Sequence, residues 1–428
     1  MALTREQQTT LVSTNAGTPM GDLFRRYWIP ALLAEELPRP DSDPVRVRLM
    51  GEDLVAFRDS DGRYGLLAEF CPHRGVSLFF ARNEECGLRC SYHGWKFDVT
   101  GACIDMPSEP EESAFKNKVK TTAYPLVQRG DILWAYMGPG DLQPALPEIE
   151  WSVLPTSNVF VSKRLQETNY LQALEGGIDS SHVSFTHKFN LDDDPLHSGS
   201  QGNVYLKRDG RPKFEVVESD GGLLIGARRD ADDENYYWRI TQYTMPWYTI
   251  IPPFGDNLIG AHAWVPIDDE NCWAWSINYH PVRELTAGER ADMVAGNGIH
   301  VAYKPGTYRP LADRANDYLI DRDAQRAKKT FSGVKGIAMQ DASLQESMGR
   351  IQDRMRERLG TSDSAIIMAR QRLLAAAKDV ASGGTPPGLE PESQHVRSAA
   401  LLLKKDVPFQ SGAHEALQIR PHTGFVSL

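Results

Sequence analysis

The sequence lacks the features that are typical of membrane proteins, exported proteins and repeat proteins. It contains no run of about 18 apolar residues, so we expect no helix that spans a membrane. The segment MALTREQQTTLVSTNAG has no basic stretch followed by an apolar one, and therefore predicts no export signal. No internal repeat is present. These absences favour a globular protein of the cytoplasm.

Positive charge is also scarce. The 47 lysine and arginine residues are outnumbered by 57 aspartate and glutamate residues, which gives a formal net charge of −10 at pH 7. Nucleic-acid binding depends on clustered basic side chains that displace counterions from the phosphates. We therefore expect no nucleic-acid surface, although a local basic patch remains compatible with an acidic partner or substrate.

Cysteine is the next scarce residue, with five in 428 residues. In a cytoplasmic chain of this size, that number favours free thiols or metal ligands over a disulfide framework. Two electron-transfer motifs are absent as well, namely the Cys-x4-Cys-x2-Cys ferredoxin pattern and the Gly-x-Gly-x-x-Gly dinucleotide loop. We therefore expect no reductase module in this chain.

The composition, 41% hydrophobic and 24% charged, is that of an ordinary globular protein, and 428 residues suit two domains. The alternating apolar and polar residues of VRVRLMGEDLVAFRD predict two strands separated by a turn at Gly51-Glu52-Asp53. Such short strands and turns predict a β domain over residues 1–145 that includes an N-terminal extension. The segment GPGDLQPALPEIEW has proline and glycine at its start and predicts a linker near residues 138–150.

The second domain is predicted over residues 146–380. Helical patterns occur in residues 165–190 and 339–378, and strand patterns occupy residues 213–282 between them. The order of helix, sheet and helix predicts an α+β domain in which antiparallel strands pack against helices. Residues 381–428 are expected to form a loop and a C-terminal tail.

Two short loops carry one cysteine and one histidine each: CPHRG, with Cys71 and His73, and CSYHGW, with Cys90 and His93. A Rieske 2Fe–2S centre needs two thiolates on one iron and two imidazoles on the other, which this set supplies. A structural zinc site is the alternative, because it also suits two cysteines and two histidines. Zinc fingers usually pair cysteine with cysteine and histidine with histidine, so the alternation here favours the cluster.

A second group of candidate ligands lies in EGGIDSSHVSFTH. Glu175, Asp179 and His182 are spaced i, i+4 and i+7, which would place them on one face of a helix. His187 lies about 140° further around an ideal helix, so the helix must end or distort between the two histidines if both bind one metal. Two histidines and one carboxylate form the facial triad of non-haem Fe(II) oxygenases. Taken alone, a histidine pair in a polar helix is more often made of ordinary surface or core residues than of metal ligands.

The two cysteine-histidine loops closely resemble those of the Rieske family. Respiratory members carry an extra cysteine in each loop, where this sequence has Val76 and Tyr92, so the chain resembles the low-potential oxygenase branch. Segments such as GTPMGDLFRRYWIPALL and MQDASLQESMGRIQDR are similar to phthalate-dioxygenase-type terminal oxygenases. The three other cysteines are expected to be small buried hydrophobic residues: Cys86, Cys103 and Cys272.

This resemblance implies an N-terminal all-β Rieske domain followed by a helix-grip-like catalytic domain that holds a mononuclear Fe(II). His182 and His187 take the positions of the two histidine ligands, and Asp341 takes that of an aspartate ligand on a late helix. Glu346 is the nearest competitor for the third position. Asp341 could equally be the N-cap of its helix.

The resemblance also implies how electrons reach the iron. Asp179 takes the place of the carboxylate that links the cluster of one subunit to the iron of its neighbour, which implies a homotrimer or stacked trimers. Glu175 would hydrogen-bond beside the ligands, or would only be a charged residue near the subunit contact. NAD(P)H would supply electrons through a separate flavin or ferredoxin reductase, and O2 would be the co-substrate.

An aromatic carboxylate similar to phthalate is the substrate that the resemblance implies, and hydroxylation is the implied reaction. Two alternatives are O-demethylation of a methoxylated aromatic acid by methyl hydroxylation and, without catalysis, a Rieske electron carrier. A carboxylate in an apolar pocket needs a cation or several N–H donors. The region expected to form the pocket sheet offers four arginines that the sequence does not distinguish: Arg208, Arg228, Arg229 and Arg239.

Overall fold

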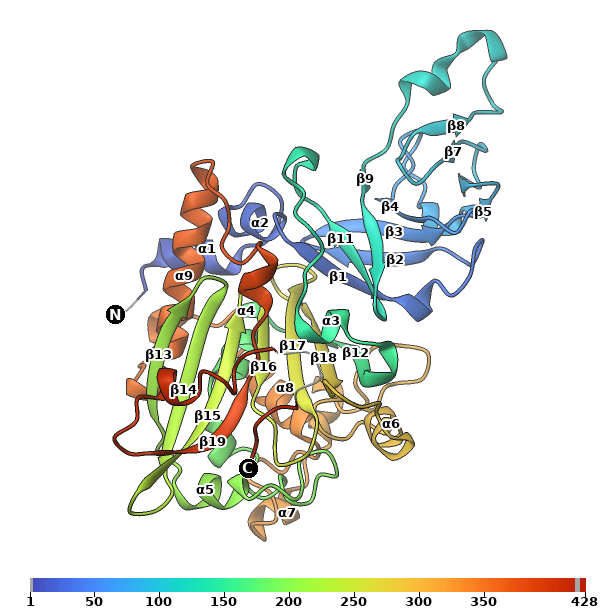
Figure 1. The fold of residues 1–428 in the computed structure, drawn as a ribbon. Helices are drawn as coiled ribbons and strands as arrows, with labels where there is room; N and C mark the ends of the chain where they lie inside the picture. The colour runs from blue at the N-terminus through green and yellow to red at the C-terminus, as the bar shows by residue number, and fades with distance from the viewer. Residues whose placement is uncertain (1–2, 420–423) are drawn as a thin grey trace. The chain divides into compact units, whose positions relative to one another are not determined.

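The computed structural model describes residues 3–419 and 424–428 of the chain (Figure 1). It contains two compact units, one formed by Thr14–Leu146 and the other by the residues up to Ser13 together with Pro147–Leu428. Within the described ranges, no helix is both long and apolar enough to cross a membrane.

The first unit is built from short antiparallel strands, as predicted. Its sheets have the strand orders β1-β11-β10, β2-β3-β4-β9 and β5-β6-β7-β8. The elements of this unit are α2 (Pro19–Phe24), β1 (Trp28–Leu33), β2 (Val45–Leu49), β3 (Glu52–Arg58), β4 (Tyr64–Ala68), β5 (Arg82–Glu84), β6 (Gly87–Arg89), β7 (Lys96–Phe97), β8 (Cys103–Asp105), β9 (Ala123–Tyr124), β10 (Leu126–Arg129) and β11 (Ile132–Tyr136).

Strands β2 and β3 form the hairpin that the alternating pattern predicts, with Leu49 opposite Glu52. Met50 and Gly51 connect them and have φ angles of 50° and 81°. A two-residue turn with two positive φ values matches the right-handed twist of the paired strands. The turn therefore begins one residue earlier than we predicted, and Glu52 belongs to β3.

The second unit contains one large antiparallel sheet. Its strand order is β12-β18-β17-β16-β15-β14-β13, and β19 also pairs with β15. The strands are β12 (Val159–Gln166), β13 (Lys213–Ser219), β14 (Gly222–Asp230), β15 (Asn235–Thr244), β16 (Tyr248–Ile251), β17 (Ile259–Pro266), β18 (Cys272–Tyr279) and β19 (Ala399–Lys404). The α+β class predicted for this unit is confirmed.

Helices cover this sheet. Helix α4 packs on β16 and β17, α8 packs on α4, and α9 packs on β13 and β14. The helices of the unit are α1 (Arg5–Val12), α3 (Glu150–Val153), α4 (Tyr170–Ile178), α5 (Gly202–Arg208), α6 (Ala287–Val294), α7 (Arg322–Arg326), α8 (Ile337–Ser347), α9 (Ser364–Ala381) and α10 (Phe409–Gly412).

Two glycines bring α4 close to its neighbours. A Cβ atom added at Gly177 would lie 2.1 Å from Cη2 of Trp264 on β17. One added at Gly176 would lie 2.2 Å from Nε2 of Gln345 on α8. The Gln345 side chain can turn away from Gly176, but the Trp264 ring cannot do so, and Gly177 therefore sets the distance between α4 and β17.

Both ends of the chain differ from the domain boundaries that we expected. Helix α1 belongs to the second unit, where the hydroxyl of Tyr170 donates a hydrogen bond to the carbonyl of Leu11 at 2.7 Å. The expected C-terminal loop and tail contains β19, which pairs with residues 235–240 of β15. On the same side of β15, β16 pairs with residues 242–244 alone. Strand β19 therefore pairs with the part of the β15 edge that β16 leaves open.

Candidate metal centres and active site

The two cysteine-histidine loops of the first unit have the same backbone geometry. The amide of Cys71 donates to the carbonyl of Val76 at 2.9 Å, and the amide of Cys90 donates to that of Trp95 at 2.8 Å. In each loop a glycine four residues after the cysteine donates back to the cysteine carbonyl and has a positive φ, 74° at Gly75 and 78° at Gly94. The conformation is one that glycine adopts without strain.

These loops bring the four predicted ligands together as two pairs. The rings of His73 and His93 have centroids 4.4 Å apart, and the thiol of Cys90 lies close enough to that of Cys71 to affect its pKa. Burial, and then the neighbouring Cys90, raise the pKa of the Cys71 thiol to about 11. Trp95 is buried and stacks on His73 at 4.3 Å.

The pairing of donors fits a two-iron cluster better than a zinc ion. Among the residues that the structure describes, one group of at least three side chains has its possible metal-binding atoms within 4.8 Å of one another. This group is His182, His187 and Asp341. The four side chains of the first unit therefore do not converge on a single ion, as a structural zinc would require. Separate thiolate and imidazole pairs are what the two irons of a Rieske cluster need.

The predicted helix over residues 165–190 is shorter than expected. Helix α4 ends at Ile178, and Asp179 is its extended C-cap residue. The carboxylate of Asp179 accepts the amide N–H groups of Ser181 at 2.6 Å and His182 at 3.3 Å. Such local bonds compete with the helix, so the helix ends before Asp179. Our expectation that Glu175, Asp179 and His182 share one helical face, and that the helix ends between the histidines, was wrong.

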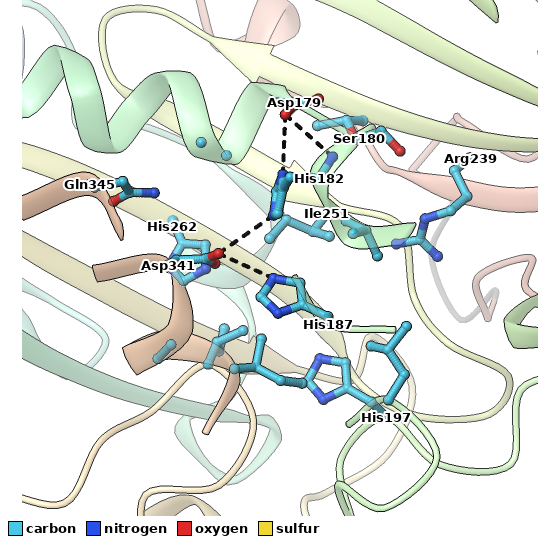
Figure 2. Close-up of a pocket in the computed structure, with 18 of the residues that line it drawn as sticks. Asp179, Ser180, His182, His187, His197, Arg239, Ile251, His262, Asp341 and Gln345 are labelled. Carbon is cyan, nitrogen blue, oxygen red and sulfur yellow. Dashed lines mark hydrogen bonds and ion pairs between the residues drawn. The ribbon is translucent and has the colours of Figure 1, made fainter. Parts of the chain in front are cut away.

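Helix α8 begins at Ile337 and its N-cap residue is Gly336. Asp341 therefore lies inside the helix, in its second turn. The N-cap alternative for Asp341 is therefore wrong. Its Oδ1 lies 3.5 Å from Nε2 of His182 and 3.2 Å from Nε2 of His187. Figure 2 shows the carboxylate of Asp341 facing both imidazole rings. Donors from two distant parts of the chain thus meet at one point.

The competitor Glu346 is engaged elsewhere. Its carboxylate accepts the hydroxyl of Tyr318 at 2.6 Å and the amide of Glu167 at 3.0 Å. Burial raises its pKa, in contrast to that of Asp341. Burial also acts to raise the pKa of Asp341, but the charge of His187 and its hydrogen bond lower it to about 2. Asp341 is therefore ionised at neutral pH, as a metal ligand must be.

Asp179 lies on the far side of His182 from Asp341. Its Oδ2 is 3.4 Å from Nδ1 of His182, so the two carboxylates contact opposite nitrogens of one ring (Figure 2). Burial acts to raise the pKa of Asp179, but the hydrogen bond with His182 lowers it. Burial likewise acts to lower the pKa of His182, and the two carboxylates raise it to about 9.

Comparison with known proteins identifies the two units. The Rieske [2Fe-2S] domain family matches residues 27–125, and the family described as LigXa C-terminal domain like matches residues 135–412. This chain is a Rieske-type oxygenase. The second unit is thus the catalytic domain that the LigXa C-terminal domain like family describes. Rieske-type oxygenases carry both a Rieske cluster and a mononuclear iron.

Several known proteins are similar to this Rieske oxygenase over most of its length. The 3-chlorobenzoate-3,4-dioxygenase oxygenase subunit of Comamonas testosteroni is 38% identical over 98% of this chain and 99% of its own. The phthalate 4,5-dioxygenase oxygenase subunit of Pseudomonas putida is 36% identical, covering 95% and 94%. The 5,5'-dehydrodivanillate O-demethylase oxygenase subunit of Sphingobium sp. is 32% identical, covering 90% and 83%.

A solved structure supports the fold. Dicamba monooxygenase bound to 3,6-dichlorosalicylic acid has a TM-score of 0.58 and 18% identity, and the match covers 84% of this chain and 98% of that one. At this identity the likeness concerns the fold alone. An all-β Rieske domain followed by an antiparallel sheet with helices is therefore the architecture of this oxygenase.

Only one of the four candidate arginines lines the cavity beside the facial triad. Arg239 is 2% exposed and shares this cavity with His182 and His187 (Figure 2). Its Nη2 donates to the carbonyl of Pro252 at 3.0 Å, and its guanidinium lies 4.1 Å from the ring centroid of Phe254. Its buried Nη1 has no hydrogen-bond partner within the described part of the chain.

The other three candidate arginines do not line the cavity and contact other parts of the second unit. Arg229 is buried but donates to the carbonyl of Ser180 at 2.9 Å, which supports the turn after α4. Arg208 donates to the carbonyl of Ala231 at 2.9 Å, and Arg228 lies over the ring of Tyr236 at 4.2 Å.

Of the predictions for Glu175 and the spare cysteines, the hydrogen bond of Glu175 beside the ligands and the burial of Cys86 are not observed. Glu175 pairs with Arg354 at 3.2 Å and Arg370 at 2.7 Å, which joins α4 to the C-terminal helices rather than to the iron ligands. Cys103 and Cys272 are buried as expected. Cys86 is only partly buried because it lies in the tight turn between β5 and β6, with a φ of 62°.

Sequence reasoning missed several polar residues of the cavity. Arg164, His197 and His262 line it together with the triad. Alternation along β12 could have placed Arg164 on the inner face of the sheet, although it could not have shown that this face encloses the triad. His197 and His262 carry no spacing signal, because each reaches the cavity from a different element. A fourth missed residue, Gln340, contacts His187 directly.

Proposed function

We propose that this chain is the terminal oxygenase component that hydroxylates an aromatic carboxylate. The observation that carries the proposal is Arg239, a buried cation with an unpartnered Nη1 in the cavity of the triad. A buried guanidinium is costly unless an anion or acceptor meets it, so a substrate carboxylate is the natural partner. Apolar side chains such as Ile251 and Trp264 line the same cavity and suit an aromatic ring.

In this proposal the two metal centres use different residues. Cys71, His73, Cys90 and His93 hold the cluster, and His182, His187 and Asp341 hold the mononuclear iron. When bound, the iron would supply a site for O2 and the cluster would supply electrons. Asp341 would contribute a negative charge that offsets the metal charge. Arg239 orients the substrate by its carboxylate.

Asp179 is proposed to connect neighbouring subunits. Its carboxylate contacts Nδ1 of His182 and is itself fixed by the amides of Ser181 and His182. A carboxylate held in this way can accept a second histidine N–H from a neighbouring Rieske domain, which would require a homotrimer or stacked trimers. Asp179→Asn should leave the metal content unchanged and slow the reoxidation of the reduced cluster by O2 and substrate. Unchanged reoxidation would refute this role.

A separate NAD(P)H-dependent reductase is the proposed electron donor. The relatives are named as oxygenase subunits, which places them in multicomponent systems. The test is reconstitution of the purified chain with a flavin and iron–sulfur reductase, followed by NADH oxidation and reduction of the cluster. Reduction of the cluster by NADH without any added protein would contradict the proposal.

The substrate class is tested with a panel of benzoates, phthalates and methoxybenzoates in the reconstituted system. We expect O2 uptake and NADH oxidation to couple to product only with compounds that carry a carboxylate. The methyl esters of the same compounds should be poor substrates, because an ester cannot offer Arg239 a negative charge. Equal turnover of acids and esters would reject the aromatic acid assignment.

O-demethylation is the second candidate reaction. The relationship to the 5,5'-dehydrodivanillate O-demethylase oxygenase subunit favours it. A methoxylated acid should then release formaldehyde in step with NADH oxidation, whereas ring dihydroxylation would give a cis-dihydrodiol. An electron carrier without catalysis does not account for a complete catalytic unit or for the converging triad.

A further inference from the structure

Gln340 contacts His187 on the side of the ring opposite Asp341. Oε1 of Gln340 lies 2.8 Å from Nδ1 of His187, and Oδ1 of Asp341 lies 3.2 Å from Nε2. Two consecutive residues of α8 therefore contact both nitrogens of one imidazole. Gln340 is fully buried and His187 is 3% exposed, so water does not compete for these contacts.

The orientation of the Gln340 amide follows from its other end. Nε2 donates to the carbonyl of Val334 at 3.1 Å and to Oδ1 of Asn190 at 2.7 Å. A backbone carbonyl is only an acceptor. If the amide were turned over, its oxygen would face the Val334 oxygen without a hydrogen between them. Oε1 therefore faces His187, and Nδ1 of His187 must carry the hydrogen.

We infer that Gln340 is a positioning residue that fixes the tautomer and ring orientation of His187 and so leaves Nε2 for the metal. This inference rests on the proposed iron site. Gln340 touches neither substrate nor reacting atoms, and acts only through His187. A histidine ligand usually donates its second N–H to a fixed acceptor, which sets the ring orientation and raises the basicity of the ligand nitrogen.

Gln340 also joins two segments that are distant in sequence. The amide of Asn190 donates to the carbonyl of His187 at 2.9 Å, so Asn190 lies in the turn that begins at this ligand. Both ends of the Gln340 side chain therefore contact the turn at 187–190, while its neighbour Asp341 supplies the carboxylate. Gln340 fixes the distance between the histidine and the carboxylate.

The two histidine ligands thus have different partners. Nδ1 of His182 lies 3.4 Å from the carboxylate of Asp179, whereas Nδ1 of His187 contacts a neutral amide. A carboxylate partner makes an imidazole more electron-rich than an amide does. His182 is placed to face a second subunit through Asp179, and His187 is held entirely within its own chain.

The test uses the full chain with its oxidised cluster in place, after removal of the mononuclear iron with a chelator. Co(II) is titrated into the site and followed by the EPR signal of high-spin Co(II), since the oxidised cluster is EPR-silent. For Gln340→Met, which keeps the length but accepts no hydrogen bond, we expect about 10- to 100-fold weaker Co(II) binding and an altered signal.

A second variant separates positioning from a purely structural role. Gln340→Glu keeps an acceptor for Nδ1–H of His187 but cannot donate to the Val334 carbonyl. We expect it to recover most of the Co(II) affinity while melting at a lower temperature than the unaltered protein, as Gln340→Met does. If Gln340→Glu binds Co(II) as weakly as Gln340→Met, the amide only holds α8 in place and the inference is overturned.

Gln242→Met is the matched control. Gln242 is 4% exposed and donates to the carbonyl of Arg397 at 3.1 Å, so the variant also loses a buried amide hydrogen bond. Co(II) affinity should not change in this variant. His187→Ala separates the inference from the proposed iron site: if it keeps full Co(II) affinity, the proposed site itself is wrong. If only Gln340→Met keeps it, the inference alone is wrong.

Discussion

The two candidate metal centres obtain their geometry in different ways. The cluster ligands lie between Cys71 and His93, on two loops with matching backbone hydrogen bonds. The proposed iron ligands come from the turn after α4, which contains His182, and from α8, which carries Asp341. Local sequence therefore shapes the first centre, whereas packing between distant elements shapes the second.

Glycines show the same difference. Gly75 in the cluster loop has a φ of 74° and an added Cβ would meet nothing within 4 Å, so only its backbone conformation requires glycine. At Gly177 in α4 the backbone is helical, and an added Cβ would strike Trp264 at 2.1 Å. The first glycine meets a local requirement and the second a tertiary one.

The largest expected effects separate the two centres completely. His187→Ala should abolish turnover and lower the iron content from about three to about two per chain, with an unchanged Rieske EPR signal. Cys90→Ala should remove the cluster iron and sulfide but leave Co(II) binding at the second site. Metal and sulfide analysis with EPR measures both. Loss of both centres in either variant would show that they are not independent.

Substitution of Arg239 should have the next largest effect, because we propose that its buried charge binds the substrate carboxylate. Arg239→Gln should raise KM for an aromatic acid about 10- to 100-fold, since a charge-assisted hydrogen bond contributes about 1.5–3 kcal/mol. Arg228→Gln is the control, because Arg228 lies over Tyr236 and outside the cavity. Steady-state kinetics should find the control unchanged. A similar rise in KM for both variants would remove the carboxylate role from Arg239.

Glu175 tests how strongly the C-terminal helices hold the catalytic unit. Glu175→Gln leaves Arg354 and Arg370 with Glu357 as their remaining carboxylate partner, and should lower the free energy of unfolding by about 2 kcal/mol at pH 7. Burial acts to raise the pKa of Glu175, but the two arginines lower it below the ordinary value of 4.5.

The sign of the pH dependence follows from this lowered pKa. The carboxylate contributes its full stability above the unfolded pKa, and that contribution is lost as the pH falls through the folded pKa. Melting curves of Glu175→Gln and the unaltered protein should therefore differ most at pH 7 and converge below pH 4.5. A difference that grows on acidification would contradict the ion pair.

The smallest effects compare the two glycines directly. Gly75→Ala should cost about 1 kcal/mol, because alanine must adopt a left-handed conformation in open space. Gly177→Ala should cost about 2–3 kcal/mol, because α4 must move away from Trp264. Chemical denaturation followed by fluorescence measures both. Equal costs would mean that α4 adjusts without strain, and would weaken the distinction between the two centres.

Several features could not be predicted for physical reasons. The end of α4 at Ile178 depends on the carboxylate of Asp179, which bonds to amides that a longer helix would have used. The choice of Arg239 among four arginines depends on which strand, and which face of that strand, lies against the cavity. The role of β19 depends on an edge of β15 that β16 leaves open.

The cluster loops, the two-domain order and the α+β class follow from residue order alone, because they depend on short-range spacing and hydrophobic periodicity. The meeting of His182 and His187 with Asp341, and the contact of Gln340 with His187, arise only when α8 packs on α4. The reason is physical: a loop specifies its own backbone, whereas the distance between ligands on separate elements is set by the side chains packed between them.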